Sequence, residues 1–144
     1  MPLAPPDGMQ VKDVMTPGAE TIRPDDTVKV AAERMRALDV GTLPVCDGTE
    51  LVGMITDRDI TIRAVAAGMD PNSTRIAEAM TPDVAYVFED APVDEAVELM
   101  RRHEVRRLPV VGRDKTLVGV VALADLARNA EQQHAAEALE GVSR

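Results

Sequence analysis

The sequence predicts an α+β fold in which one βαββα unit occurs twice in tandem. Three tripeptides of the first half recur in the second half in the same order, the first two of them 65 residues later. They are Met15-Thr16-Pro17 with Met80-Thr81-Pro82, Leu43-Pro44-Val45 with Leu108-Pro109-Val110, and, after a one-residue insertion, Leu51-Val52-Gly53 with Leu117-Val118-Gly119. Repetition that keeps register over such a stretch indicates that the two halves share one fold.

Each half begins with an extended stretch followed by an amphipathic helix. The extended stretches are Thr21–Arg23 and Tyr86–Phe88. Each helix has apolar residues on one stripe at helical spacing. The two stripes are Val28, Ala31, Ala32, Met35 and Leu38 in the first half, and Val93, Ala96, Val97 and Met100 in the second. Asp25, Asp26 or Thr27 can cap the first helix, and Pro92 suits the first position of the second.

Two apolar runs and a closing helix complete each half. In the first half the runs Leu43–Cys46 and Leu51–Ile55 flank an Asp47-Gly48 turn, which favours a β-hairpin. The second half repeats them as Leu108–Val111 and Leu117–Val121. The closing helices are expected from about Asp57 to Ala67, and from about Leu123 into the Ala-, Glu- and Gln-rich end of the chain.

Composition narrows the class of protein. With 144 residues and 45% hydrophobic content, the chain suits one ordinary domain, or two small units that share a core. Aromatic residues make up 1% of the chain, which argues against single-strand nucleic-acid binding by base stacking. The net charge of −9 argues against phosphate backbones and anionic lipid. We expect neither a nucleic acid nor a membrane as partner.

The single cysteine, Cys46, excludes an internal disulfide framework and favours a reducing cytoplasm. No run approaches the roughly 20 apolar residues of a membrane span, so we expect a cytoplasmic protein. Cys46, His103 and His134 lack the spacing of metal ligands. A nucleophile, base and orienting group at motif-like spacing, a P-loop and a dinucleotide fingerprint are also missing. The sequence therefore predicts neither a metal site nor an enzyme.

These motifs together resemble the tandem cystathionine-β-synthase (CBS) domain pair, or Bateman module, of the stand-alone bacterial type. The resemblance rests on Met-Thr-Pro, the amphipathic helix, Val-Gly-Thr-Leu-Pro-Val or Val-Arg-Arg-Leu-Pro-Val, and Leu-Val-Gly-Met-Ile-Thr-Asp-Arg-Asp-Ile. It implies two βαββα repeats packed about a pseudo-twofold axis. The expected boundaries are a disordered tail at 1–8, one CBS domain at 9–70, a second at 71–130, and a helical extension at 131–144.

The resemblance also implies a regulatory ligand, an adenosine-containing nucleotide (AMP, ADP, ATP or NAD, or S-adenosylmethionine) in a cleft between the repeats. The adenine would lie against the Met-Thr-Pro loop and the strand before Leu-Pro-Val, a carboxylate would hold the ribose, and basic residues would hold the phosphates. One adenine pocket would be lined by Met15, Gly18, Val40 and Gly41, and the other by Met54, Met80 and Val105, with Val120 also among the binding residues. Any of these Met and Val side chains could instead belong to the core.

The ribose carboxylates implied by the resemblance are Asp59 and Asp125. Asp59 lies in Thr56-Asp57-Arg58-Asp59, which also has the spacing of a plain capping box, with Thr56 as N-cap. Capping and ligand binding are compatible. In the second half Ala122 replaces the hydroxyl residue, which removes a cap or ligand contact worth about 1 kcal/mol. We therefore expect the two sites to be unequal.

Arg106 and Arg107 are the densest positive spot on this acidic chain. Adjacent guanidinium groups suit a phosphate, and on a strand they point to opposite faces. The resemblance assigns Arg107 to the cleft that holds Asp125. The alternative is surface salt bridges to nearby glutamates. The first half has Gly41-Thr42 here, so which cleft fills first stays open.

The sequence thus predicts a nucleotide-responsive sensor that signals through a change of conformation or of partner affinity. A homodimer is expected, together with an unidentified protein effector. The alternative is a ligand-free scaffold for dimerisation or interaction that keeps the CBS fold.

Overall fold

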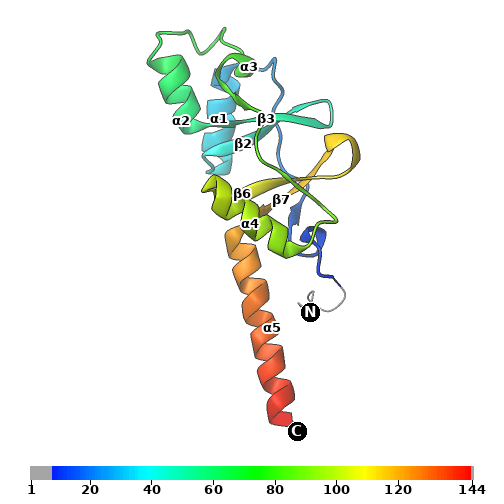
Figure 1. Cartoon of the computed structure of the whole chain (residues 1–144). Coiled ribbons are helices and arrows are strands. Elements are labelled where there is room, and N and C mark those ends of the chain that lie inside the picture. Colours follow the sequence, from blue (N-terminus) through cyan, green and yellow to red (C-terminus); the bar gives the residue numbers. More distant parts are fainter. Residues whose placement is uncertain (1–7, 144) are drawn as a thin grey trace. The chain divides into compact units, whose positions relative to one another are not determined.

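The computed structural model describes residues 8–143 and divides the chain into two compact units (Figure 1). Unit 1 comprises Met1–Gly18, Ala85–Gly112 and Val118–Arg144, and unit 2 comprises Ala19–Val84 and Arg113–Leu117. Both units combine helices with a β-sheet, which confirms the α+β prediction. The tail expected at residues 1–8 lies, apart from Gly8, outside the described residues.

Unit 2 is built on a three-stranded antiparallel sheet in the order β2-β3-β4. The predicted hairpin is present as β2 (Thr42–Asp47) and β3 (Glu50–Thr56), and the short β4 (Thr81–Pro82) pairs with β3. Ile22, in the middle of the expected extended stretch, forms an isolated parallel bridge with Val45. The short turn segment η3 (Arg113–Lys115) also belongs to this unit.

Helices cover the sheet of unit 2. The helix α1 (Val28–Leu38) begins where expected, because Thr27 is its N-cap and the Thr27 hydroxyl accepts from the Val30 N–H at 3.3 Å. The closing helix starts as α2 (Asp57–Asp59) and continues as a π-helix, η2 (Ile60–Val65). A short helix, α3 (Ile76–Ala79), leads into β4.

The closing helix of unit 2 differs in geometry from that of unit 1, because η2 is π-helical whereas α5 is an α-helix. Its residues Ile60 and Ala64 face the core, at 9% and 1% exposure. Arg63 stands four residues after Asp59, whereas Arg128 stands three residues after Asp125. The repeat pattern predicted a helix here, but not this change in its geometry.

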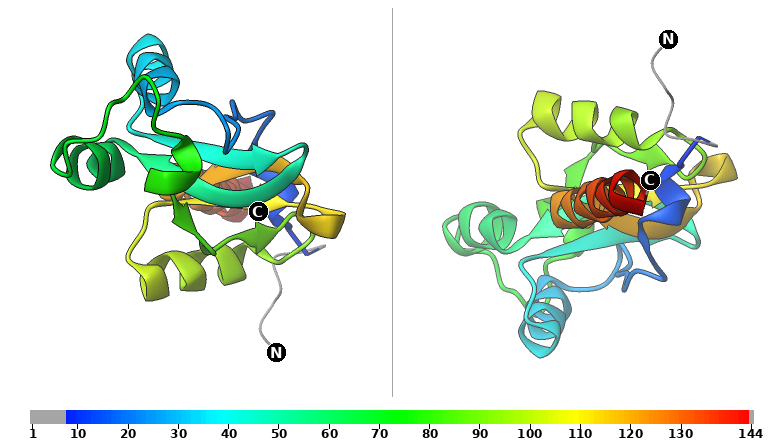
Figure 2. Two further views of the ribbon diagram at one scale, coloured as in Figure 1. Left: turned by 90° about the horizontal axis from the view of Figure 1, so that it is seen from above. Right: turned by 90° about the horizontal axis from the view of Figure 1, so that it is seen from below.

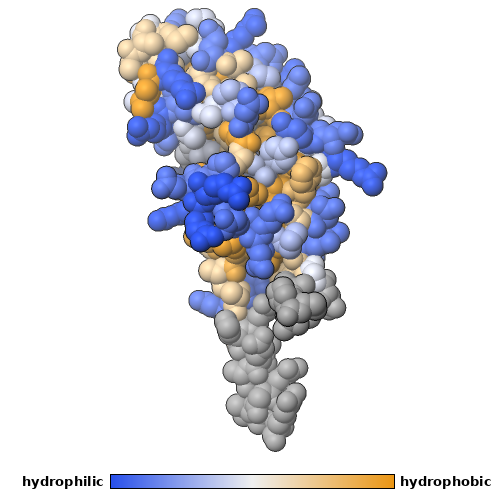
Figure 3. Space-filling model, viewed as in Figure 1, coloured by the Kyte–Doolittle hydropathy of each residue, from blue (hydrophilic) through white to orange (hydrophobic). Residues whose placement is uncertain are grey.

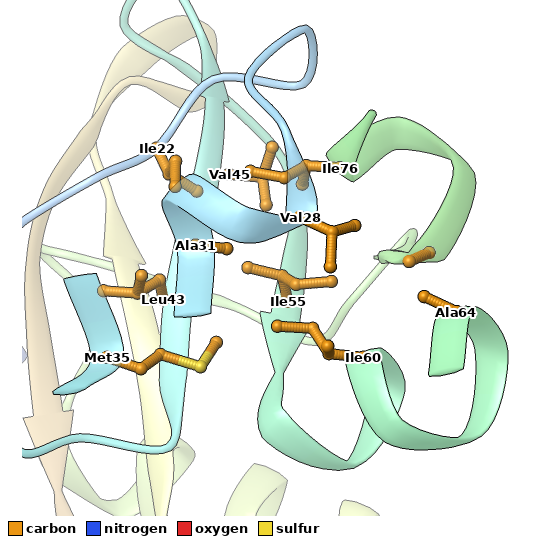
Figure 4. Close-up of a cluster of buried hydrophobic side chains, with 11 residues drawn as sticks. Ile22, Val28, Ala31, Met35, Leu43, Val45, Ile55, Ile60, Ala64 and Ile76 are labelled. Carbon is orange, nitrogen blue, oxygen red and sulfur yellow. The ribbon is translucent and has the colours of Figure 1, made fainter. Parts of the chain in front are cut away.

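The core of unit 2 brings the sheet and its helices together (Figure 4). Its buried members come from α1, β2, β3, η2 and α3, and from Ile22 before α1. They are Ile22, Val28, Ala31, Met35, Leu43, Val45, Ile55, Ile60, Ala64, Ile76 and Ala79. Figure 4 shows Ile55 of β3 between Val28 of α1 and Ile60 of η2. Packing in this core thus holds the end of β3 next to the start of the closing helix.

Unit 1 repeats this plan with a sheet in the order β1-β7-β6-β5. Its strands are β1 (Thr16–Pro17), β5 (Val87–Phe88), β6 (Arg107–Val111) and β7, which spans Leu117–Ala122 and starts at the last residue of unit 2. A 3-10 turn, η1 (Val11–Asp13), precedes β1. Pro92 is the N-cap of α4 (Val93–His103) and not its first helical residue. Figure 2 shows α4 lying on one side of β5.

The second closing helix, α5 (Leu123–Ser143), is 21 residues long and starts where expected. It runs through the segment expected to be a helical extension. The core of unit 1 consists of Val11, Val87, Ala91, Ala96, Met100, Leu108, Val110, Val121 and Leu126. Leu126 of α5 corresponds to Ile60 of unit 2, and both are 9% exposed.

The units do not coincide with the sequence repeats. The segment that begins the first repeat, through β1, packs in unit 1, where β1 pairs with β7 of the second repeat. The segment that begins the second repeat packs in unit 2, where β4 pairs with β3 of the first. Val11 and Ile76, which occupy equivalent positions in these segments, are both fully buried in the core of the other repeat.

We expect Ile55→Ala to lower the free energy of unfolding by about 2–5 kcal/mol, because it opens a cavity at the centre of the unit 2 core. Ile62→Ala removes the same atoms from a side chain that is 51% exposed, and should change stability by no more than about 0.5 kcal/mol. Urea denaturation of both variants measures this difference. Equal losses would mean that Ile55 is not at the packing centre.

Candidate functional site

In each unit a Met-Thr-Pro segment lies against the glycine of a Leu-Val-Gly strand. A Cβ atom at Gly53 would lie 2.7 Å from the Thr81 carbonyl oxygen and 3.0 Å from Met80 Sδ. A Cβ atom at Gly119 would lie 2.5 Å from the Thr16 carbonyl oxygen and 2.9 Å from Met15 Sδ. These separations are too short for any side chain at either glycine, so the close approach depends on both glycines.

In unit 2 this contact brings Thr81 to a partly buried carboxylate. Asp59 is 12% exposed, and its Oδ2 atom accepts from the Thr56 N–H at 3.0 Å. In return the Asp59 N–H donates to Thr56 Oγ1 at 3.0 Å, which completes the capping box. The Thr81 hydroxyl lies 3.5 Å from both carboxylate oxygens. We call Thr56, Asp59, Arg63 and Thr81 the Asp59 cradle.

Arg63 closes the cradle from the π-helix. Its Nη1 atom donates to the Met80 carbonyl at 2.9 Å and to the Ala79 carbonyl at 3.2 Å. The same atom lies 3.4 Å from the Thr81 hydroxyl and 3.9 Å from Asp59 Oδ1. The cradle therefore joins residues of the first repeat to the start of the second.

The start of β2 lies beside the start of α2. The Gly41 carbonyl accepts from the Asp57 N–H at 3.0 Å, and a Cβ atom at Gly41 would lie 3.0 Å from Asp57 Oδ2. Met54 of β3 is the register partner of Thr81. Val40 and Met80 are partly buried and pack against the unit 2 core. Met54 and Met80 thus lie next to residues of the cradle, and Val40 and Met80 also have the core role that the sequence left open.

Unit 1 forms the corresponding site with different polar groups. Asp125, 16% exposed, accepts from the Ala122 N–H at 3.1 Å, but Ala122 has no hydroxyl to accept in return. Arg128, one turn further along α5, pairs directly with Asp125. The Arg106 carbonyl accepts from the Leu123 N–H at 2.8 Å, as Gly41 does from Asp57. The polar contacts of Asp59 and Asp125 therefore differ, while unequal ligand binding stays a prediction.

A shallow polar hollow of about 240 Å³ lies next to Asp125. Four of its residues are on one face of α5, and two follow or end η1. The lining residues are Asp13, Val14, Asp125, Arg128, Asn129 and Gln132. The hollow places the Asp125 carboxylate and the Arg128 guanidinium at a surface that a small polar molecule can reach.

Arg106 and Arg107 are both exposed. Within the part of the chain that the structure describes, neither side chain forms an ion pair. By contrast, Arg101 and Arg102 both pair with Glu98, and the hydrogen bond from Arg101 lowers the pKa of that carboxyl. Arg106 and Arg107 thus keep their donors available for an anion.

Each predicted site residue belongs to one of the two units. Unit 2 holds Val40, Gly41, Met54, Thr56, Asp59 and Met80, and unit 1 holds Met15, Gly18, Val105, Arg106, Arg107, Val120 and Asp125. Each unit therefore collects one set of the motif segments. Within a unit, however, it is Met80 that accompanies Val40 and Gly41, and Met15 that accompanies Val105. Ligand binding by these residues stays a prediction.

Three residues of the unit 2 site were missed from the sequence, namely Asp57, Arg63 and Thr81. Thr81 lies inside the repeated Met-Thr-Pro motif, so its repetition was an available signal. The different spacing of Asp59 to Arg63 and Asp125 to Arg128 was a second signal. Asp57 approaches Gly41 only through the fold, and no spacing in the sequence indicates it.

Among the residues that the structure describes, no three His, Cys, Asp or Glu side chains are grouped closely enough to hold a metal ion. Cys46 is buried, and burial raises the pKa of its thiol. His103 is exposed on the last turn of α4. Over the same described residues, no helix is both long and apolar enough to cross a membrane.

The chain is thus a tandem module of two βαββα repeats. The repeats exchange their first segments, and each has a carboxylate at the start of its closing helix. The CBS domain model matches residues 11–65 and 76–131. The chain belongs to the CBS-domain family. Hypoxic response protein 1 of Mycobacterium tuberculosis is 41% identical over 119 residues, which cover 82% of each chain.

Solved structures of CBS pairs have the same fold. The crystal structure of Hypoxic Response Protein I with two coordinated zinc ions matches 84% of this chain and 98% of that one, with a TM-score of 0.77 and 40% identity. CBSX2 in complex with AMP matches 88% and 99%, with a TM-score of 0.75 and 28% identity. The CBS pair of protein MJ0100, in complex with 5-methylthioadenosine and S-adenosyl-L-methionine, matches 87% and 98%, with a TM-score of 0.71 and 30% identity.

The capping boxes give a reciprocal prediction. Thr56→Ala should lower the free energy of unfolding by about 1 kcal/mol, because the Asp59 N–H loses its acceptor. Ala122→Thr should raise it by about 0.5–1 kcal/mol, because a hydroxyl there can accept from the first turn of α5. Urea melts of the two variants check both signs. A loss of stability in Ala122→Thr would show that unit 1 has no room for the second half of the box.

Proposed function

We propose that this CBS pair is a regulatory module that binds an adenosine-containing nucleotide (AMP, ADP, ATP or NAD) at the Asp59 cradle and at its Asp125 counterpart. One observation carries the proposal: each unit places a mostly buried carboxylate where a closing helix begins, and a Met-Thr-Pro segment from the other repeat pairs with the strand that leads into that helix. The AMP complex of CBSX2 and the S-adenosylmethionine complex of MJ0100 support this ligand class.

The chemistry of the cradle suits a ribose. A carboxylate oxygen accepts more than one hydrogen bond, so Asp59 can take ribose hydroxyls while Oδ2 still accepts from the Thr56 N–H. The side chains of Val40 and Met80 are partly buried and offer an apolar contact for the adenine ring. The backbone of Gly41 offers polar groups for the edge of that ring. In unit 1, Arg106 and Arg107 have unpaired guanidinium groups suited to phosphate.

A module of this kind acts by changing the population of states and not by turnover. A ligand shifts such an equilibrium only if it binds one state better than another. A homodimer and a protein effector are therefore part of the proposal, as is the absence of catalysis. The net charge of −9 disfavours nucleic acid and membrane as partners.

A ligand-free interaction scaffold is the second candidate, and the contacts of unit 1 favour it. The Asp125 carboxylate is already paired with Arg128, and Ala122 contributes no hydroxyl. If the same held for both sites, the fold would serve only for assembly. Unit 2 differs, because the Asp59 carboxylate is 3.9 Å from the nearest guanidinium atom and keeps accepting capacity.

The test is thermal denaturation of the purified protein with AMP, ADP, ATP, NAD and S-adenosylmethionine. A ligand at about 100 times its Kd stabilises by roughly 2.7 kcal/mol, which raises the Tm by several degrees. We expect one of these compounds to do so, and Asp59→Asn or Asp125→Asn to abolish the shift and identify the occupied site. Asp47→Asn, an exposed carboxylate at the end of β2, is the matched control and should keep the shift.

If no compound raises the Tm at millimolar concentration, the scaffold replaces the nucleotide sensor. If a compound raises the Tm equally in the wild type and in both site variants, the ligand binds somewhere other than these carboxylates.

A further inference from the structure

Arg63 connects two segments that are far apart in the sequence. Its Nη1 atom donates to the carbonyls of Ala79 and Met80, at the end of α3, and lies 3.9 Å from Asp59 Oδ1. The side chain is 47% exposed, so these contacts are formed at the surface of the core and not within it. One guanidinium thus spans the carboxylate of the first repeat and the backbone of the second.

Arg63 and the corresponding basic residue of unit 1 have different partners. In α5, which is a regular helix, Arg128 stands three residues after Asp125 and pairs with that carboxylate directly. In unit 2, Arg63 stands on the π-helix η2, four residues after Asp59, and its Nη1 atom lies 3.9 Å from Asp59 Oδ1. Arg63 passes the carboxylate and binds the backbone of the incoming segment instead. The two arginines therefore have different roles.

The segment that Arg63 holds leads out of unit 2. Met80 and β4 are followed by Asp83, which has a left-handed backbone with φ 52°, and the chain leaves unit 2 between Val84 and Ala85. The position of Met80 and Thr81 therefore determines where this connection starts. Figure 3 shows apolar side chains lying among polar ones on the face of the molecule that it draws. On η2, Ile62 and Val65 are 51% and 63% exposed.

We propose that Arg63 is a positioning residue that holds Met80 and Thr81 against Asp59, and so couples occupancy of the Asp59 carboxylate to the connection at Val84–Ala85. This rests on the proposed function, because the coupling needs a ligand at Asp59. Both carboxylate oxygens lie 3.5 Å from the Thr81 hydroxyl, but Oδ2 also accepts from the Thr56 N–H, whereas Oδ1 faces Arg63. A ribose hydroxyl that donates to Oδ1 therefore enters the contact that positions the segment.

The experiment measures amide hydrogen exchange in the segment 80–84, where every residue except Pro82 has an amide hydrogen, in the full chain with and without saturating AMP. The variants are Arg63→Met, which keeps length but removes the donors, and Arg63→Lys, which keeps the charge. Arg128→Met is the matched control in unit 1. Without ligand, Arg63→Met should speed exchange at 80–84 by about tenfold, the loss expected for a hydrogen bond from a charged donor. Arg63→Lys should speed it less, and Arg128→Met should leave it unchanged.

With AMP, the wild type and Arg128→Met should exchange more slowly at 80–84 than without it. Arg63→Met should lack this effect at AMP concentrations that saturate it, as shown by its own binding curve. If Arg63 served only to stabilise the fold, the Arg63→Met variant would still exchange more slowly at 80–84 when saturated with AMP than without it. Retention of that effect in Arg63→Met would overturn the coupling.

Failure of the proposed function and failure of the positioning role of Arg63 give different results. If wild-type protein binds neither AMP nor the other adenosine compounds, the proposed function and the coupling both fail, while the ligand-free exchange still decides the positioning role. Unchanged ligand-free exchange at 80–84 in Arg63→Met would overturn that role whatever binds. A variant that speeds exchange equally throughout α1, β2 and 80–84 would also overturn it, because the effect would then be general instability.

Discussion

The fold depends on one close approach, that of a Met-Thr-Pro backbone to a glycine in the neighbouring strand. At Gly53 and Gly119 the carbonyl oxygen of a threonine lies within 2.7 and 2.5 Å of the position that a Cβ atom would take. This allows β4 to pair with β3 and β1 with β7, and it buries Ile76 and Val11 in cores built by the other repeat. The polar sites follow from the same contact, because it is what brings Thr81 to Asp59.

Much of this could be predicted from the sequence because repetition carries it. The hairpins, the amphipathic helices and the starts of both closing helices agree with the pattern, since turn residues and apolar spacing are local signals. The capping residues Thr56 and Asp59 were evident for the same reason. Which repeat receives each Met-Thr-Pro segment was not, because pairing between distant segments is decided by the complementarity of their surfaces.

The π-helix and the contacts of Arg63 could not be predicted from the apolar pattern. A helical stripe is recognised from its apolar residues, and Ile60 and Ala64 face the core in η2 as they would in a regular helix. The polar face of the same helix is what changes. Arg63 moves away from its own carboxylate, while Arg128 in the regular α5 stays beside Asp125. Two repeats of one ancestry thus hold their carboxylates by different means.

The exchange of the first segments also bears on how such a chain could have arisen. A polypeptide with a single repeat would have a sheet lacking its edge strand and a starting segment with no strand of its own to join. Two such molecules could satisfy each other by trading those segments, each completing the sheet of its counterpart. The tandem chain is then, in structural terms, an intertwined pair of single repeats joined end to end, in which neither half can be cut away without leaving the other incomplete.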